Sequence, residues 1–214
     1  NPTIAGIEQA DAILIIGANP RREAAVLNAR IRKAWRAGGV EIGVIGEAGD
    51  LTYDYTHLGA GIDSLADLAS GKGSFAKMLK KAQRPIVIVG EGAVTGASAK
   101  NVVGFATEIA KTAGALTADW NGFAVLHTAA SRVGALDIGL VPGRGGLDTA
   151  GMLKAAGTGK LDVLFVLGAD EIDMSGLGET KVVYIGTHGD AGAHRADVIL
   201  PAATYTEKSA TYVN

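Results

Sequence analysis

Two glycine-containing turns are the segments of this sequence whose residue types best suit ligand binding. The first, Gly17-Ala18-Asn19-Pro20, follows an apolar run and places Asn19 where a helix N-cap is expected and Pro20 at the first helical position. Backbone N–H groups at a helix start after a buried strand commonly bind phosphate. Arg21 and Arg22 could contact an anion, although a helix cap beside two solvated arginines fits the same residues.

The second turn, Leu167-Gly168-Ala169-Asp170, also follows an apolar run and carries a carboxylate in place of the amide. A local Asx turn also explains Asp170. Micromolar binding requires about 8 kcal/mol, whereas the charge at a helix N-terminus contributes about 0.3 to 1 kcal/mol. A nucleotide would therefore need further partners at either turn, and Gly17, Asn19, Gly168 and Asp170 are the candidate positions.

The other motifs predict no catalytic residue and no metal site. The sequence has no Cys, so it cannot ligate an iron–sulfur cluster or use a cysteine nucleophile. Its 4 His residues include no pair at metal-ligand spacing, and no G-x-S-x-G elbow is present. The glycine-rich segment at residues 89–96 lacks dinucleotide-binding spacing and predicts a tight strand-to-helix turn, while residues 155–160 lack a phosphate-loop pattern.

The elements that must position these turns alternate between strands and helices. Short apolar runs rich in β-branched residues predict strands that are buried on both faces, at residues 12–16, 42–45, 86–89, 163–167, 182–185 and 198–200. Apolar stripes at helical spacing predict helices at residues 20–37, 98–113 and 122–136, the second stopping at Gly114. This alternation is typical of a doubly wound α/β fold with mostly parallel sheets flanked by helices.

The domain boundary is predicted near Ala118, giving α/β domains at residues 1–118 and 119–214, with one continuous sheet as the alternative. The helix at residues 20–37 also gathers a basic face opposite its apolar stripe, formed by Arg22, Arg32, Lys33 and Arg36.

Composition excludes several classes of protein. With 214 residues the chain can bury a sizeable core, and a net charge of -2 argues against a nucleic-acid binder. No apolar run is long enough to span a bilayer, so we expect no direct membrane insertion. The absent initiator Met and the abrupt end lead us to expect a piece of a longer protein.

The end of the chain resembles the molybdopterin oxidoreductase superfamily, in which a strand ending in Pro is followed by Glu, a small residue, Thr and Asn. Further blocks narrow the resemblance to the large iron–sulfur subunits of respiratory complex I, the NADH:quinone oxidoreductase. These blocks are Thr3-Ile4-Ala5-Gly6-Ile7, Gly17-Ala18-Asn19-Pro20-Arg21, Asn28-Ala29-Arg30-Ile31-Arg32-Lys33, Asp50-Leu51-Thr52-Tyr53, His57-Leu58-Gly59 and Glu207-Lys208-Ser209-Ala210-Thr211-Tyr212-Val213-Asn214. The likeness covers essentially the whole chain and is least distinctive at residues 90–159.

The resemblance implies Rossmann-like domains that act as a scaffold in the peripheral arm of complex I, on the cytoplasmic or matrix side of the inner membrane. It implies that Gly17, Asn19, Gly168 and Asp170 are vestiges of a site for molybdopterin guanine dinucleotide, so no cofactor is expected here. Iron–sulfur clusters would lie in the N-terminal part of the parent subunit. Ser209-Ala210 stands where molybdenum enzymes more often have Gly, which argues against a close cofactor approach.

Two other classes of protein remain open. One is a fragment of a true molybdenum enzyme of the formate dehydrogenase or nitrate reductase type. The other is the middle domain of a thiamine-diphosphate enzyme, to which residues 84–90 and the following predicted helix are similar. On the complex I interpretation, the partners are other peripheral-arm subunits, and the basic face is a hypothesis for one contact with them.

Overall fold

The computed structural model describes residues 2–169 and 171–213, which form two compact units. The first unit extends to Ala129 and the second begins at Ala130, further along the chain than the boundary expected near Ala118. The difference has two causes. A strand at residues 123–126 pairs with the first sheet, and Gly134 and Ser131 bond to Val213 near the C-terminus.

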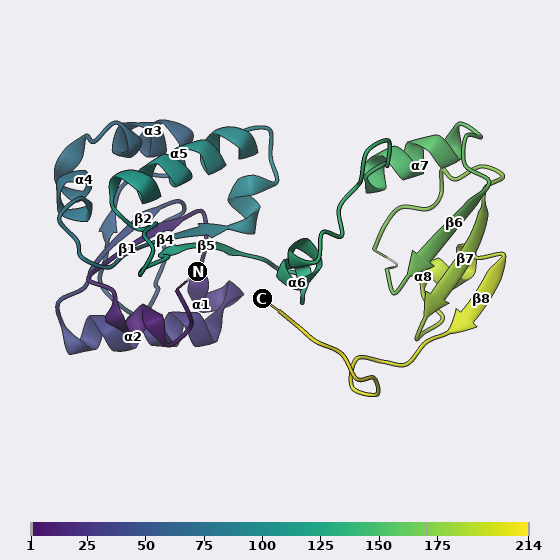
Figure 1. Cartoon of the computed structure of the whole chain (residues 1–214), viewed down its shortest axis with the longest axis horizontal. Coiled ribbons are helices and arrows are strands. Elements are labelled where there is room, and N and C mark those ends of the chain that lie inside the picture. The colour runs from purple at the N-terminus through teal and green to yellow at the C-terminus, as the bar shows by residue number, and fades with distance from the viewer. Residues whose placement is uncertain (1, 170, 214) are drawn as a thin grey trace. The chain divides into compact units, whose positions relative to one another are not determined.

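The first unit is a five-stranded parallel sheet of order β3-β2-β1-β4-β5 (Figure 1). Its central strands are built from β-branched and other apolar residues that are buried on both faces, as parallel strands require. The strands are β1 (Ala12–Ile16), β2 (Glu41–Ile45), β3 (Thr56–His57), β4 (Pro85–Gly90) and β5 (Phe123–Leu126).

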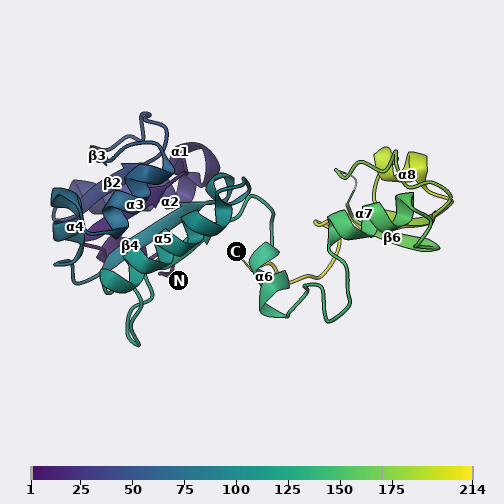
Figure 2. The same cartoon turned by 90° about the horizontal axis from the view of Figure 1, so that it is seen from above.

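Helices cover both faces of this sheet (Figures 1 and 2). One face packs against η1 (Gly6–Gln9), α1 (Pro20–Glu23) and α2 (Ala25–Ala37), and the other against α3 (Ile62–Ala69), α4 (Gly73–Leu79) and α5 (Ala99–Thr112). A short 3-10 helix, η2 (Glu91–Val94), follows β4. The chain winds from β1 outward to β3 and then returns beside β1 as β4, so the first unit is doubly wound.

The second unit is a three-stranded parallel sheet of order β6-β7-β8. Its strands are β6 (Val163–Leu167), β7 (Lys181–Gly186) and β8 (Val198–Pro201), and its helices are α6 (Arg132–Asp137), α7 (Thr149–Gly157) and α8 (Ala191–Arg195). One core of this unit lies between the sheet and α7, α8 and the β6–β7 connection, where Met174 and Leu177 are buried.

The expected fold class is confirmed, and each of the six predicted strands is present. Two of the predicted helices differ from the structure. The helix expected at residues 20–37 is interrupted at Ala24, which separates α1 from α2. The helix expected at residues 122–136 is wrong, because Phe123–Leu126 is β5 and only Arg132–Asp137 is helical.

The expectation that every strand is buried on both faces is also wrong for the second sheet. In β6, Leu164 and Val166 are buried, whereas Val163, Phe165 and Leu167 are exposed. The reason is that α7 and α8 pack on the same face of the sheet (Figure 2).

Candidate functional site

The Gly17 turn lies where the sequence predicted it, at the carboxyl end of β1. Gly17 has φ +56°, a left-handed conformation that favours glycine, and its N–H donates to the carbonyl of Ile45 at 2.7 Å. The turn therefore connects β1 to α1 and is hydrogen-bonded to the last residue of β2. A cavity of about 590 Å³ opens beside it, between this turn and residues 47–50.

Asn19 is the N-cap residue that precedes α1, but its side chain does not cap the helix. The Asn19 N–H, which could have met a ligand, donates instead to the Oε1 of Glu23 at 2.6 Å. Asn19 Oδ1 is buried without a hydrogen-bond partner among the described residues. The N–H of the N-cap residue therefore already has an anionic acceptor from its own chain.

The arginines of this turn face carboxylates. Arg21 Nη1 forms an ion pair with Asp50 Oδ2 at 2.5 Å, and both side chains are exposed. The backbone N–H of Thr52, at 2.8 Å from Asp50 Oδ1, and the Arg21 guanidinium hold the pKa of Asp50 below its ordinary value. Arg22, Glu23 and Glu47 complete the charged lining of the cavity. Three carboxylates against two guanidinium groups make it a poor site for a polyphosphate.

The crevice at the switch point of the first sheet is filled by the chain itself. In doubly wound sheets ligands bind outside the carboxyl ends of the strands where the strand order reverses, here between β1 and β4. A Cβ on Gly90 would lie 2.2 Å from the Gly17 carbonyl oxygen, and one on Gly17 would lie 2.5 Å from Ala93 Cβ. The turn after β1 and η2 after β4 are therefore in direct contact, leaving no space for a ligand between them.

Gly168 occupies the same place in the second unit that Gly17 occupies in the first. It follows β6, has φ +59°, and donates its N–H to the Ile185 carbonyl at 2.8 Å on the neighbouring strand. A cavity of about 430 Å³ at the carboxyl ends of the strands is lined by residues that include Gly168, His188 and Lys208. The predicted site residue Asp170 lies outside the described residues.

The structure shows residues of this region that the sequence analysis did not single out. Glu91 is buried at the carboxyl end of β4, and its Oε2 accepts hydrogen bonds from the Thr128 backbone N–H at 2.6 Å and from the Thr128 hydroxyl. Glu23 is the other such residue. Glu23 lies four residues after Asn19, one more than the capping-box spacing, so that motif gave no signal for it.

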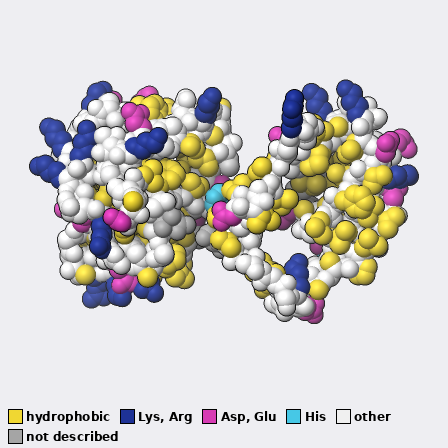
Figure 3. All heavy atoms as spheres, viewed as in Figure 1, with side chains coloured by type: hydrophobic (Ala, Val, Ile, Leu, Met, Phe, Trp, Pro, Cys, Tyr) yellow, Lys and Arg dark blue, Asp and Glu magenta, His cyan; other side chains and the backbone are white. Residues whose placement is uncertain are grey.

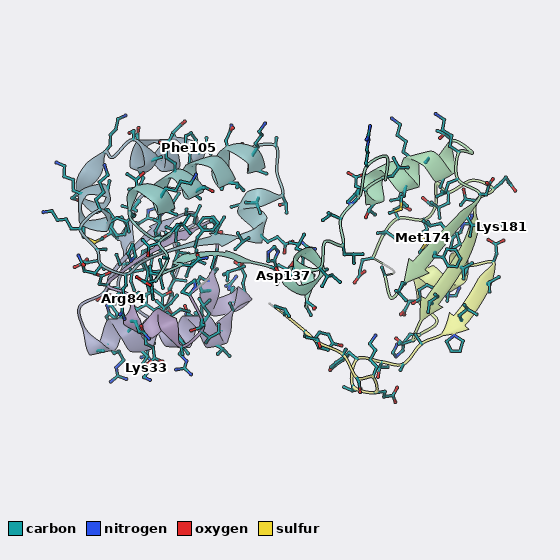
Figure 4. All side chains as sticks on the ribbon, in the orientation of Figure 1. Lys33, Arg84, Phe105, Asp137, Met174 and Lys181 are labelled. Atoms are coloured by element: carbon teal, nitrogen blue, oxygen red, sulfur yellow. The ribbon has the colours of Figure 1, made fainter. Side chains whose placement is uncertain are left out.

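The predicted basic face is exposed on α1, which carries Arg22, and on α2, which carries Arg32, Lys33 and Arg36 (Figures 3 and 4). Two of its residues are partly engaged: Lys33 pairs with Glu8 at 2.6 Å, and Arg32 Nε donates to the Thr52 carbonyl at 3.1 Å. Hydrogen bonds from Lys33 and Arg30 lower the pKa of Glu8. Arg22 and Arg36 are exposed and extend the face toward the two ends of the helical segment.

Residues 2–169 and 171–213 contain neither a candidate metal site nor a membrane-spanning helix. These ranges contain no group of three or more His, Asp or Glu side chains placed to hold a metal ion. In the same ranges no helix has both the length and the apolar character needed to cross a membrane.

The sequence and its α/β fold match a known class of protein. A model of the molybdopterin oxidoreductase family matches residues 1–214. The chain therefore belongs to the molybdopterin oxidoreductase family.

Within this family the chain is similar to subunits of respiratory NADH dehydrogenases, as the sequence resemblance indicated. It is 44% identical to the mitochondrial NADH-ubiquinone oxidoreductase 78 kDa subunit of Neurospora crassa, over 100% of this chain and 28% of that protein. It is 41% identical to an NADH-quinone oxidoreductase subunit of Rickettsia bellii, over 100% of this chain and 30% of that protein. The chain thus spans less than a third of the length of these curated relatives.

Proposed function

We propose that this chain is part of the large subunit of a proton-pumping NADH:quinone oxidoreductase and acts there as a cofactor-free scaffold. The identity of 40% or more to three such subunits over the whole chain supports the assignment. The parent protein would be an oxidoreductase, with its iron–sulfur clusters in a part of the polypeptide that contains cysteines. This segment has none and would support the electron-carrying part without reacting itself.

One observation carries the proposal that no cofactor binds. The turn at Gly17 packs against Gly90 and Ala93, so no ligand fits between the turn and η2. The cavity beside the turn is lined by three carboxylates, and Glu23 accepts a hydrogen bond from the Asn19 N–H, one of the donors that a phosphate could use. Gly17 and Asn19 therefore serve the fold, and we extend this interpretation to Gly168 and Asp170 as vestiges of the same ancestral site. No residue of this chain is proposed as a catalytic group or metal ligand.

The proposed partners are other subunits of the peripheral arm of complex I, with no nucleic acid among them. The proposed location is the cytoplasmic or matrix side of the inner membrane, held there by the complex. The absence of membrane-spanning helices among the described residues agrees with a peripheral position.

Neither alternative class is favoured. A fragment of a formate dehydrogenase or nitrate reductase would need the cofactor crevice that η2 fills. The likeness to a thiamine-diphosphate enzyme covers only the middle of the chain, whereas the molybdopterin oxidoreductase model covers residues 1–214.

The test is calorimetric titration of the chain with GMP and with a guanine dinucleotide, together with metal analysis of the full-length subunit. We expect no saturable heat, no molybdenum, and no NADH oxidation by the 214-residue chain alone. Saturable micromolar binding that Asn19→Ala abolishes, or stoichiometric molybdenum in the parent protein, would overturn the cofactor-free assignment. Failure of the full-length subunit to co-purify with other peripheral-arm subunits would overturn the assignment to the complex.

A further inference from the structure

The second sheet carries a continuous apolar face that no described element covers. Strand register aligns its side chains in rows across the sheet: Phe165, Val183 and Val198 form one row, and Leu167, Ile185 and Leu200 form the next. Phe165 and Leu167 are 67% and 73% exposed. The face is visible as the apolar area over β6, β7 and β8 in Figure 3.

The equivalent positions of the first unit are fully buried. β1 ends one residue before Gly17 and β6 ends one residue before Gly168, so Leu14 corresponds to Phe165 and Ile16 to Leu167. Leu14 and Ile16 are 0% and 2% exposed because α3, α4 and α5 pack against them. The strand residues thus have the same apolar character in both units, and what differs is the helical layer over them.

Topology explains why this layer is absent from the second unit. Connections between parallel strands are almost always right-handed, so strands added in one direction place their crossovers on one face. The chain passes from β6 to β7 to β8 in one direction, and its crossovers pack on the face that contains Leu164 and Val166. In the first unit the opposite face is covered where the chain returns from β3 through α3 and α4 to β4, beside β1, and continues through α5 to β5.

We propose that the same polypeptide, outside these 214 residues, completes this sheet. A further segment would add a parallel strand to the free edge of β6 and lay a helix over Phe165 and Leu167, as β4 and the helices before it do for β1. The second unit would then have the doubly wound arrangement of the first.

Three observations favour a segment of the same polypeptide as the structure that covers this apolar face. Both rows consist entirely of apolar side chains, as in strands that are buried on two faces within one fold. The edge of β6 is unpaired within residues 2–169 and 171–213, so a strand has a place to join. The curated relatives are long enough to contain such a segment, because the region matched by this chain is only 28% to 30% of each relative.

The test is photo-crosslinking in the full-length subunit. The photoreactive residue p-benzoylphenylalanine replaces Phe165, a substitution of one aromatic side chain by another, and a second variant carries it at Leu167. After irradiation, crosslinked peptides are identified by mass spectrometry of the purified subunit, with a mixture of isotope-labelled and unlabelled protein to separate contacts within one polypeptide from contacts between copies. We expect both positions to crosslink within one polypeptide, to a segment outside the 214 residues.

The matched control carries the same probe at Leu140, which is also 73% exposed but lies in the segment after α6 and not on a strand of the second sheet. We expect it to yield different crosslinked peptides. The proposal fails if Phe165 and Leu167 crosslink to residues 2–129, to a second copy, to another subunit of the assembled complex, or to no peptide at all. It also fails if Leu140 yields the same peptides as Phe165 and Leu167, since the reaction would then not report the sheet face.

Discussion

At the scale of single residues, the contact between Gly17 and Ala93 makes a measurable prediction. Gly17→Ala should destabilise the first unit in two ways: a non-glycine residue in the left-handed region costs about 1 to 2 kcal/mol, and forcing a methyl group against Ala93 costs about 1 to 3 kcal/mol. The sum, about 2 to 5 kcal/mol, would appear in urea unfolding followed by tryptophan fluorescence.

Two control variants separate these causes. Gly114 has φ +75° at the end of α5, and no neighbouring atom lies within 4 Å of the position that a Cβ would take there, so Gly114→Ala should cost only the backbone strain. The double variant Gly17→Ala/Ala93→Gly removes the nearest atom and should recover the packing cost. Equal destabilisation by Gly17→Ala and Gly114→Ala would show that the two loops are not in contact.

Asp197 predicts how the second unit responds to acid. Its carboxylate accepts a hydrogen bond from the Val182 backbone N–H at 2.9 Å and pairs with Lys181 at 3.0 Å, which joins β7 to the start of β8. The Val182 hydrogen bond, followed by the Lys181 contact, lowers the pKa of Asp197 from its ordinary value of 3.8. Because the folded-state pKa is lowered, this stabilisation is present above pH 3.8 and is lost as the pH falls through the folded-state value.

Asp197→Asn should therefore unfold at lower urea concentration than the wild type near neutral pH. The difference should shrink as the pH falls below 3.8, because protonation removes the same charge from the wild type. Urea midpoints of the second unit, measured over a series of pH values by hydrogen exchange, test this. A difference that stays constant across the acid range would contradict the assigned role of the Asp197 charge.

At the scale of elements, the basic face of α1 and α2 predicts, on the proposed function, a contact surface for neighbouring subunits. Arg22 and Arg36 are exposed, whereas Lys33 is partly neutralised by Glu8. Arg22→Glu/Arg36→Glu should lower the yield of the assembled peripheral arm several-fold at low salt, with a smaller effect at high salt because exposed charges are screened. Co-purification of neighbouring subunits with the tagged full-length protein measures this yield.

The matched control is Lys100→Glu/Lys111→Glu, which reverses two exposed charges on α5, a helix on the opposite face of the sheet. We expect normal assembly from this control. Assembly that is unaffected by Arg22→Glu/Arg36→Glu, or reduced equally by both double variants, would mean that the basic face is simply solvated.

The strands were predictable because their signal is local. Residues 12–16 and 163–167 are uninterrupted apolar runs ended by glycine, and both are strands with those bounds. The helix predicted over residues 122–136 failed because Phe123 and Leu126 satisfy helical spacing equally well, and pairing with β4 decided in favour of a strand. The break at Ala24 and the open face of β6 depend on tertiary packing and have no signature in the apolar pattern.

The candidate site was predictable in position and only partly in chemistry. Gly17 lies at the carboxyl end of β1 with positive φ, as a glycine after a strand suggests. The acceptor that satisfies Asn19 is Glu23, and the segment that fills the crevice is η2, which approaches Gly17 from residues far along the chain. Single-sequence patterns carry no information about such a long-range approach.

At the scale of the whole molecule, the chain contains separate cores that share no residue. The first unit buries side chains on both faces of its sheet, and the second has its own cluster around Val166, Val182 and Tyr184. Residues 136–150, which belong to the second unit, are exposed throughout and include the turn at Arg144. The core of the first unit is therefore expected to keep its structure when the chain is cut there.

Limited trypsin digestion of the 214-residue chain tests this independence. Arg144 is exposed in a non-helical segment, so cleavage there should be early and should give fragments 1–144 and 145–214. Arg144→Gln, which removes the site, should abolish this pair of fragments without changing the unfolding midpoint of the first unit. The cleaved first unit should also unfold at the same urea concentration as in the intact chain, because its core uses no residue beyond Leu126. A lower midpoint after cleavage would show that the second unit contributes to the stability of the first.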